Sequence, residues 1–217
     1  MASQRVELIH TPNYEQIKTA FLQELIRASQ NKSSSISFVK QQRSHKPLIK
    51  EGVVQGIVIG GTNYVLSTEE VKENGKRNVL ERKAGMLPVF DTKKTFEDFL
   101  SEHLDSRAYA IGINFGFKLD PVTGLHGALD GKIIAKGTKD HAFIGTTEPI
   151  GAIARNIFKN RYNKEIPIAV TNDAVALLFA GDGTEEASLI AGTGFNMGMR
   201  IDNTLINLEA GGFDKFP

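Results

Sequence analysis

The chain has 217 residues, with 26 basic and 25 acidic side chains and an apolar fraction of 41%. This composition is typical of a globular protein and excludes wholesale disorder. A formal net charge of +1 gives no long-range attraction to nucleic acid or to an anionic membrane, so we expect neither as a partner. There is no cysteine, which excludes disulfides, thiolate metal sites and cysteine nucleophiles.

Export and membrane insertion both need apolar segments that this sequence lacks. No stretch approaches the roughly 18 apolar residues of a membrane span. The segment 1–16 carries acidic residues and has no apolar signal core. We therefore expect a cytoplasmic enzyme or binding protein, and the length allows one domain or two small ones.

Residues 1–50 contain none of the 21 glycines and predict a helix followed by a polar connection. Thr11 is expected to cap this helix, and Pro12 suits its first position. A polar run at 30–35 ends the helix, and a short strand is predicted at 36–39. The apolar face of the helix consists of Ile17, Phe21 and Leu25.

Strands and helices alternate after Gly52, which predicts an α/β protein with a parallel or mixed sheet covered by helices. Asn74-Gly75 lies between two strands and favours the positive φ angles of a tight hairpin turn. Thr146 or Thr147 can cap a helix that has Pro149 in its first turn. The predicted strands are 53–59, 64–71, 76–82, 107–117, 166–170 and 187–191, and the predicted helices are 91–104, the segment from Pro149 past Ile157, and 174–180.

The hairpin around Asn74-Gly75 is rich in basic residues. A solvated edge strand, whose charges discourage further strand pairing, is a much commoner reason for this pattern than a nucleic-acid surface. We therefore expect an exposed edge of the sheet here. The basic residues are Lys72, Lys76, Arg77, Arg82 and Lys83.

Two glycines and a hydroxyl follow the strand at 53–59, in the order Gly60, Gly61, Thr62 and Asn63. Glycine lets the backbone approach a phosphate closely, and the freed amides and the threonine hydroxyl can donate to its oxygens. The segment is neither G-x-G-x-x-G nor a Walker loop. A phosphate loop and a plain tight turn both stay open.

A second candidate, Asn172-Asp173, lies where a predicted strand gives way to a helix. Aspartate is a preferred N-cap, and a cap is its commoner role in this position. A carboxylate at the carboxyl end of a strand can also be a general base, because ligands of α/β proteins bind at that end. The sequence does not separate these roles.

Three further segments carry polar residues beside turns. The run Gly192-Thr193-Gly194, followed by Asn196, repeats the order of strand, glycine and threonine. Two such turns would hold a phosphate chain from both sides, and the alternative is another β-turn. Thr138-Lys139 lies in a polar loop, and Glu209 lies between apolar residues. Their alternatives are a solvated loop and an exposed carboxylate at a strand end.

Taken in chain order, these segments resemble the motifs of the hexokinase family. That family carries a Gly-Gly-Thr-Asn phosphate loop, a Thr-Lys sugar loop, an Asn-Asp pair, a Gly-Thr-Gly-x-Asn loop and an Asn-x-Glu segment. The corresponding segments are 59–64, 138–139, 172–173, 192–196 and 207–213. The resemblance covers most of residues 36–217, and its specificity comes from the ordered set.

The resemblance implies an α/β fold of the actin-like ATPase (ribonuclease H-like) type, with two lobes. Residues 52–170 would form the small lobe. Residues 1–51 would supply a helix and connection on the side of the large lobe, and 171–217 would begin that lobe without completing it. The chain would then be a homo-oligomer or would pair with a C-terminal half.

The resemblance also implies a hexokinase-like carbohydrate kinase that transfers the γ-phosphate of ATP to a hexose, with glucose the favoured sugar and Mg²⁺ accompanying ATP. Asp173 would be the base, with Lys139 beside it in the catalytic set. The residues holding the sugar would be Thr138, Lys139, Asn172, Asp173, Asn196 and Glu209. The residues facing the phosphates would be Gly60, Gly61, Thr62, Asn63, Gly192, Thr193 and Gly194. No side chain is assigned as a direct metal ligand.

Several family positions differ here, which raises a second hypothesis. The carboxylate that precedes the first glycine loop in the family is Val58, and the arginine after that loop is Val65. Gly137 and Ala210 stand where the family has tryptophans, and Gly116 stands where it has a serine. These changes favour a non-catalytic sugar- or nucleotide-binding sensor on the same fold. We expect little kinase activity from the isolated chain; an actin-like ATPase without a sugar substrate is a third possibility.

Overall fold

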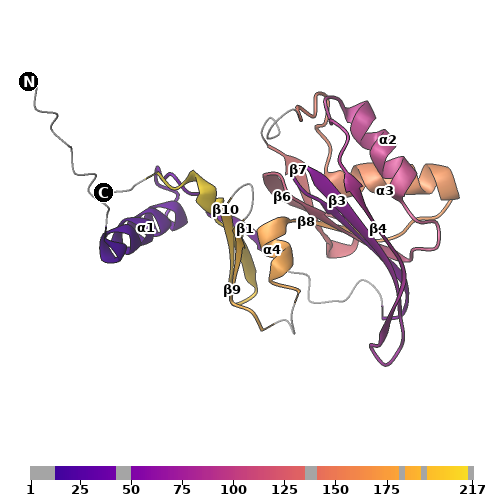
Figure 1. Ribbon diagram of the computed structural model, residues 1–217, viewed down its shortest axis with the longest axis horizontal. Coiled ribbons are helices and arrows are strands. Elements are labelled where there is room, and N and C mark those ends of the chain that lie inside the picture. Colours follow the sequence, from indigo (N-terminus) through magenta and orange to yellow (C-terminus); the bar gives the residue numbers. More distant parts are fainter. Residues whose placement is uncertain (1–12, 43–49, 135–140, 181–183, 192–194, 215–217) are drawn as a thin grey trace, which may run out of the picture.

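The structure is a computed structural model that describes residues 13–42, 50–134, 141–180, 184–191 and 195–214. One end of the molecule holds a twisted sheet with two helices on it, and the other holds a smaller sheet and the first helix (Figure 1). None of the described helices is long and apolar enough to cross a membrane.

The first helix, α1 (Tyr14–Ser29), is capped by Asn13. The Asn13 side chain accepts a hydrogen bond from the Gln16 amide at 3.0 Å, and the Gln16 side chain accepts one from the Asn13 amide at 3.2 Å. This capping box satisfies two amides at once, so the prediction of Thr11 as the cap is wrong. Thr11 and Pro12 themselves lie outside the described residues. Phe21 and Leu25 of α1 pack against a cluster at the end of the chain, as their helical spacing predicts.

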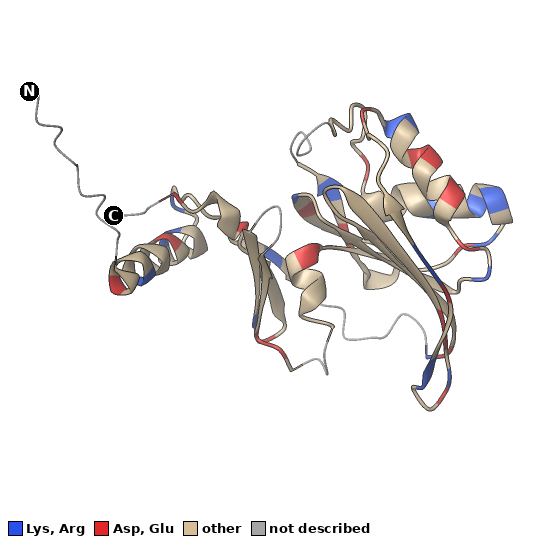
Figure 2. Cartoon of the chain, viewed as in Figure 1, with Lys and Arg blue, Asp and Glu red and all other residues tan. Residues whose placement is uncertain are grey.

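The larger sheet has five strands in the order β4-β3-β2-β5-β8. The pairs β2–β5 and β5–β8 are parallel and the others are antiparallel, so the predicted mixed sheet is confirmed. β4 is an edge strand and almost wholly exposed, with basic and acidic side chains mixed along the hairpin (Figure 2). The strands are β2 (Gly52–Ile59), β3 (Asn63–Val71), β4 (Arg77–Met86), β5 (Ala110–Phe115) and β8 (Ile168–Asn172).

The turn between β3 and β4 is present but differs in detail from the prediction. Only Gly75 has a positive φ, of 75°. The Lys72 amide donates to the Lys76 carbonyl at 2.9 Å, which closes a three-residue loop. The side chain of Asn74 accepts the Lys76 amide at 3.0 Å instead of adopting a left-handed backbone.

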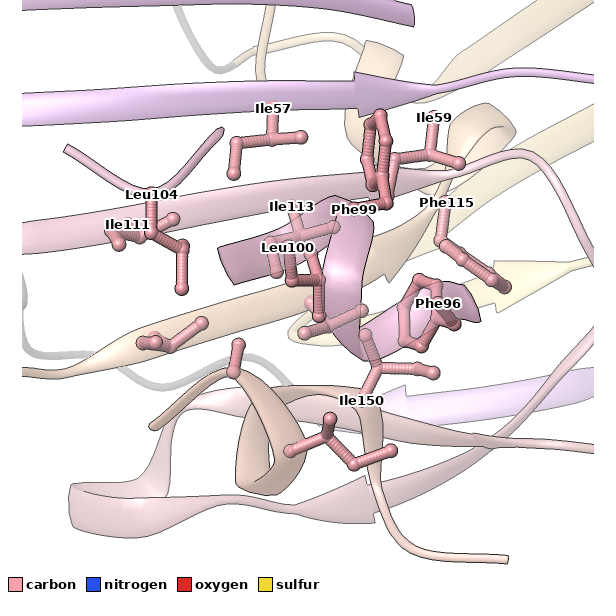
Figure 3. Close-up of a cluster of buried hydrophobic side chains, with 14 of the residues drawn as sticks. Ile57, Ile59, Phe96, Phe99, Leu100, Leu104, Ile111, Ile113, Phe115 and Ile150 are labelled. Atoms are coloured by element: carbon pink, nitrogen blue, oxygen red, sulfur yellow. The ribbon is translucent and has the colours of Figure 1, made fainter. Parts of the chain in front are cut away.

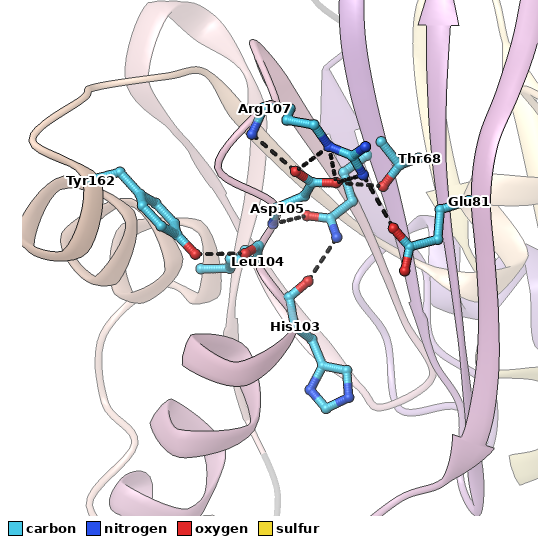
Figure 4. A network of polar contacts seen from close by, with 8 residues as sticks. Thr68, Glu81, His103, Leu104, Asp105, Arg107 and Tyr162 are labelled. Carbon is cyan, nitrogen blue, oxygen red and sulfur yellow. Dashed lines mark hydrogen bonds and ion pairs between the residues drawn. The ribbon is translucent and has the colours of Figure 1, made fainter.

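β5 is shorter than the predicted strand at 107–117 because its first residues bond elsewhere. The Arg107 amide donates to the Asp105 carboxylate at 2.9 Å, and the Arg107 guanidinium joins Asp105 to Glu81 of β4 (Figure 4). Thr68 of β3 donates to the same aspartate at 3.1 Å. Hydrogen bonds from Arg107 hold the pKa of Asp105 below its ordinary value. The Arg107 amide is thus bonded to a side chain and does not pair with a neighbouring strand.

The core lies between one face of the large sheet and helices α2 (Lys93–His103) and α3 (Ile150–Tyr162). Alternate residues of β2 and β5 enter it, as the pleat of a strand requires. Phe96 of α2 meets Phe115 of β5 edge to face, with ring centroids 5.9 Å apart. Figure 3 shows these rings among Ile57, Ile59, Phe99, Leu100, Ile111, Ile113 and Ile150.

A hairpin that the sequence analysis did not predict follows β5. It consists of β6 (Leu119–Thr123) and β7 (Leu129–Ile133), with Pro121 opposite Gly131. Proline and glycine both weaken the sequence signal of a strand.

This hairpin also supplies the cap of α3. The Asp130 carboxylate of β7 accepts the amides of Gly131 and Gly151, each at 2.8 Å. Thr146 and Thr147 do not cap the helix; Pro149 occupies the N-cap position without a side-chain bond. The predicted caps fail because an aspartate from another strand takes that role. Burial raises the pKa of Asp130, with Arg155 3.6 Å away opposing the rise.

The smaller sheet has the order β1-β11-β10-β9, with every pair antiparallel. Its strands are β1 (Val39–Gln42), β9 (Ala187–Ala191), β10 (Phe195–Ile201) and β11 (Thr204–Asn207). β9 matches its prediction. β1 begins three residues later than expected, because the chain bends at residues 35 and 36. At this bend the buried Glu24 carboxylate of α1 accepts the Ser35 amide at 2.6 Å, and Ile36 is buried.

Helix α4 (Asp173–Leu177) directly follows β8 and packs against β9 and β10. It is shorter than the predicted helix at 174–180, because 178–180 form tighter turns whose amides bond three residues back. Val175 and Leu178 anchor the segment against Leu205 of β11. α4 therefore joins the larger sheet to the smaller one.

Candidate functional site

The carboxyl ends of three parallel strands lie side by side at one edge of the larger sheet. Ile59 of β2 pairs with Phe115 of β5, and Phe115 pairs with Asn172 of β8. With strands spaced about 4.8 Å apart, the Gly60 turn begins roughly 10 Å from Asp173. The structure thus brings two of the sequence-predicted segments to the same edge, where ligands of α/β sheets bind.

The turn from Gly60 to Asn63 is tight and open on one side. The Gly60 amide donates to the Asn63 carbonyl at 3.0 Å, and a Cβ on Gly60 would lie 3.1 Å from that carbonyl oxygen. A Cβ on Gly61 would meet no atom within 4 Å. Packing therefore explains glycine at position 60, whereas the space over Gly61 is unfilled.

Gly116 brings the end of β5 close to this turn. Its amide donates to the Ile59 carbonyl at 2.7 Å, and a Cβ there would lie 3.2 Å from the Gly60 Cα. A serine at this position, as in the family, would crowd the turn. Glycine at position 116 therefore permits the close approach of β5 to this turn.

The N-cap of α4 is Asn172, and Asp173 is the first residue of the helix. Asn172 Oδ1 accepts the Ala174 amide at 3.0 Å, and Asp173 Oδ1 accepts the same amide at 2.7 Å. The capping role considered for Asp173 thus belongs to its neighbour. Burial raises the pKa of Asp173, although hydrogen bonds from Ala174 and Asn196 oppose the rise.

Three buried asparagines and Glu209 form one hydrogen-bonded chain beside Asp173. Asn196 Nδ2 donates to Asn172 Oδ1 at 3.3 Å and to Asn207 Oδ1 at 2.9 Å. Asn207 Nδ2 donates to Glu209 Oε1 at 2.7 Å. Four predicted site residues, Asn172, Asp173, Asn196 and Glu209, are thus brought together.

Strand ends and one strained residue place these side chains. Asn196 is the second residue of β10, and Asn207 is the last residue of β11. Glu209 follows with φ 46° and ψ 47°, a left-handed conformation that costs a non-glycine residue about 1–2 kcal/mol. Its half-buried carboxylate is held against Asn207 by this bend.

The sequence analysis included Asn207 in the Asn-x-Glu segment but gave it no role among the site residues. The available signal was its spacing from Glu209, because residues two apart in an extended segment lie on the same side. Of the other predicted residues, Thr138, Lys139, Gly192, Thr193 and Gly194 lie outside the described residues. Their expected place around this site stays a prediction.

The described residues suit phosphate oxygens better than a directly bound metal. Among them, no three His, Cys, Asp or Glu side chains come together as a metal ion requires. Val58 lies one residue before the end of β2, is 40% exposed and has no ligating atom.

Gly198 sets the distance between α4 and β10, which gives a first prediction. A Cβ there would lie 2.6 Å from both the Ala174 carbonyl oxygen and Ser188 Oγ. We expect Gly198→Ala to displace α4 and to cost about 1–3 kcal/mol of unfolding free energy, as overpacking does. Urea unfolding measures this.

Gly112→Ala is the matched control, because a Cβ on that strand glycine meets no atom within 4 Å. It should leave stability unchanged or raise it. Equal losses in the two variants would contradict the placement of α4.

The fold has solved relatives, although no protein-family model and no curated protein match this sequence. A hexokinase from Schistosoma mansoni, complexed with glucose, matches 90% of the chain at 18% identity with a TM-score of 0.66. A second solved hexokinase matches 94% at 17% identity with a TM-score of 0.63. The chain covers 50% and 54% of those two chains.

The chain thus has the fold of about half of a hexokinase. Its mixed α/β architecture is of the actin-like ATPase type, and the fold class implied by the sequence motifs is confirmed.

Proposed function

We propose that this chain is a hexokinase-type carbohydrate kinase, or the N-terminal half of one, that transfers the γ-phosphate of ATP to a hexose hydroxyl. The observation that carries the proposal is the connected group of Asn172, Asp173, Asn196 and Glu209 beside the open turn at Gly60 and Gly61. Glucose is the favoured sugar, since one of the matched hexokinases is complexed with it. A cytoplasmic location remains the expectation from the sequence.

Hydrogen-bonding capacity supports a sugar as the ligand. Carboxylates accept hydrogen bonds from hydroxyls, and a carboxamide can both donate and accept. Asp173 and Glu209 would accept from sugar hydroxyls on two sides of the site. Thr138 and Lys139 are proposed to complete the set from the sugar loop.

Asp173 is proposed as the base. It would take the proton of the attacking hydroxyl while the new O–P bond forms and the bond between the γ-phosphorus and the bridging oxygen breaks, releasing ADP. A burial-raised pKa brings this carboxylate nearer to the pH at which a base works best. Because the ionised form is required, hexose phosphorylation should fall as the pH drops through the raised pKa.

Phosphate binding is proposed for the two glycine turns. Amides of Gly61 and Thr62 would donate to phosphate oxygens in the open space over Gly61, with Gly192, Thr193 and Gly194 opposite. Mg²⁺ would neutralise phosphate charge when bound with ATP. This chain's own contribution is to hold the nucleotide and to exclude water from the transfer.

A complementary C-terminal half is the proposed partner. In the larger sheet, the antiparallel strands β4, β3 and β2 are followed by the parallel strand β5. In the smaller sheet, the antiparallel strands β11, β10 and β9 end at β9, and the described residues place no further strand beside it. Leu189 on that edge strand is 56% exposed. These features support a division of the chain into lobes near residues 52 and 171. The C-terminal half would complete the second lobe. A second copy of this chain is the other candidate partner.

The test measures binding and turnover separately. Calorimetric titration of the isolated chain with glucose should show binding, and a coupled assay with Mg-ATP should show little turnover until a C-terminal half is added. Absence of glucose binding would overturn the sugar-site proposal. Turnover by the isolated chain at an ordinary rate of about 1–1000 per second would overturn the need for a partner.

A non-catalytic sensor is the second candidate. The observation that favours it is Val58, an exposed apolar residue where the resembled family has a carboxylate. Glucose binding without phosphoryl transfer, even in the presence of a C-terminal half, would favour the sensor over the kinase.

A further inference from the structure

We propose that Asn207 is a positioning residue of the hexose site, which fixes the amide direction of Asn196 and the orientation of Glu209. The inference rests on the proposed hexose site and assigns a role to Asn207, the asparagine of the Asn-x-Glu segment, to which the sequence analysis gave none. Asn207 is 4% exposed, so a ligand reaches it only through its neighbours.

Asn207 is held rigidly by two neighbouring strands. It pairs with Gly198 of β10 and with Val39 of β1. Its side chain then makes three hydrogen bonds: Oδ1 accepts from Asn196 Nδ2 at 2.9 Å and from the Glu209 amide at 3.4 Å, and Nδ2 donates to Glu209 Oε1 at 2.7 Å.

A carboxamide has distinct donor and acceptor ends, so Asn207 imposes a direction on its neighbours. Its Oδ1 requires the Asn196 amino group to point toward it. Asn196 Oδ1 then faces the amides of Met197 and Ala210, at 2.8 and 3.2 Å. The same Asn196 amino group also reaches Asn172, the cap of α4, at 3.3 Å.

The result is a fixed path from one carboxylate to the other. It runs from Glu209 through Asn207, Asn196 and Asn172 to the helix that begins with Asp173. Because Asn207 donates to Oε1 of Glu209, it holds this carboxylate in one orientation toward a ligand. Loss of the direction would free the Glu209 carboxylate to rotate, whereas Asn196 would still be held by the amides of Met197 and Ala210.

Asn207→Asp tests the direction while conserving size. The new side chain has no amino group, so two carboxylates would face each other where Nδ2 and Oε1 now lie 2.7 Å apart. Such a pair retains a proton, which raises the pKa of one member. Hexose binding by the variant would therefore depend on whether this pair of carboxylates holds a proton.

Other charged groups on the surrounding elements have partners elsewhere. Lys40 of β1 lies over the Phe38 ring, Lys118 donates to Ser37, and Arg200 of β10 donates to the Leu178 carbonyl. Asp173 on α4 is linked to Asn207 only through Asn196 and is unchanged by the substitution. Of these charged groups, Glu209 is the one bonded to Asn207.

The experiment is calorimetric titration with glucose at about pH 7.5 and about pH 5.5, for wild type and variant. We expect Asn207→Asp to weaken binding about tenfold or more at the higher pH, and the ratio of variant to wild-type Kd to shrink at the lower pH as the pair takes up its proton. Asp173 is present in both proteins, so its titration changes both Kd values alike and cancels in their ratio.

Two further variants separate positioning from simple damage to the fold. In the double variant Asn207→Asp with Glu209→Gln, the new glutamine amide would donate to the new aspartate, which reverses the direction of the wild-type hydrogen bond. Because no pair of carboxylates remains there, the ratio of the double variant's Kd to the wild-type Kd should no longer depend on pH. Asn203→Asp places the same change in the exposed β10–β11 turn and should bind glucose like wild type.

Stability provides a readout that does not need a ligand. The raised pKa of the new pair means that the folded Asn207→Asp protein holds an extra proton, so its stability relative to wild type should be greatest at low pH and decline as the pH rises through that pKa. A wild type that fails to bind glucose would overturn both proposals. Glucose binding that Asn207→Asp leaves unchanged, or weakens equally at both pH values, would overturn the positioning role alone.

Discussion

Replacing Asp173 by asparagine is expected to remove most of the affinity for glucose while the protein stays folded. Asparagine can still accept the Ala174 amide, and the cap of α4 is Asn172, so the local structure keeps its support. What is lost is the negative charge that would accept a sugar hydroxyl. Binding should weaken about tenfold or more, and turnover in a complete kinase should fall by roughly 100-fold or more.

Stability should move in the opposite direction. Burial raises the pKa of Asp173, so its folded form favours the proton, and the stability that this provides is lost as the pH rises through the folded pKa. The neutral amide avoids that loss. The melting temperature of Asp173→Asn should therefore equal or exceed that of wild type at neutral pH, and the advantage should vanish in acid.

Asp202→Asn is the matched control for this prediction. Asp202 is exposed in the β10–β11 turn with φ 51°, a conformation that asparagine adopts readily. It should change neither glucose binding nor stability by a measurable amount. Glucose binding that survives Asp173→Asn unchanged would remove the central residue of the kinase proposal.

Phe96→Ala is expected to cost about 3–5 kcal/mol of unfolding free energy, which is a large part of the stability of a domain. Phe96 is fully buried and contacts the rings of Phe90, Phe115 and Phe143. Truncation would leave a cavity between α2 and the sheet that such a rigid cluster cannot close. Denaturant unfolding, followed by circular dichroism, measures the change.

Met86→Ala is the control, because Met86 ends β4 and is 77% exposed. It should shift the unfolding midpoint little. A loss below about 1 kcal/mol for Phe96→Ala would show that α2 does not pack on the sheet as described.

Much of the local structure of this chain could be predicted from the sequence. The strands β2, β3 and β9 lie close to where apolar, β-branched runs predict them, and Gly75 makes the turn that separates β3 from β4. These signals work because alternation of side chains and turn chemistry depend on neighbours in sequence. The ordered motifs likewise predicted the fold class, and they included four residues that the structure joins in one network.

Helix caps were harder, because several nearby side chains compete for the same amides. Asn13 takes the role predicted for Thr11, and Asn172 takes the role considered for Asp173. For α3 the cap comes from Asp130, on a strand 21 residues earlier in the chain. No local pattern around Pro149 could indicate an acceptor brought in by tertiary packing.

The sequence by itself indicated the residues that we propose as the site of this protein; the tertiary structure decided how the described ones among them are connected. Asn207 gains its role because β11 pairs with β10, which sets its side chain between Asn196 and Glu209. Asp173 gains its raised pKa because α4 is packed against β9 and β10, and packing removes the water that would stabilise the charge. Hydrogen-bond direction and desolvation arise from groups far apart in the chain, so they exist only once the sheets have assembled.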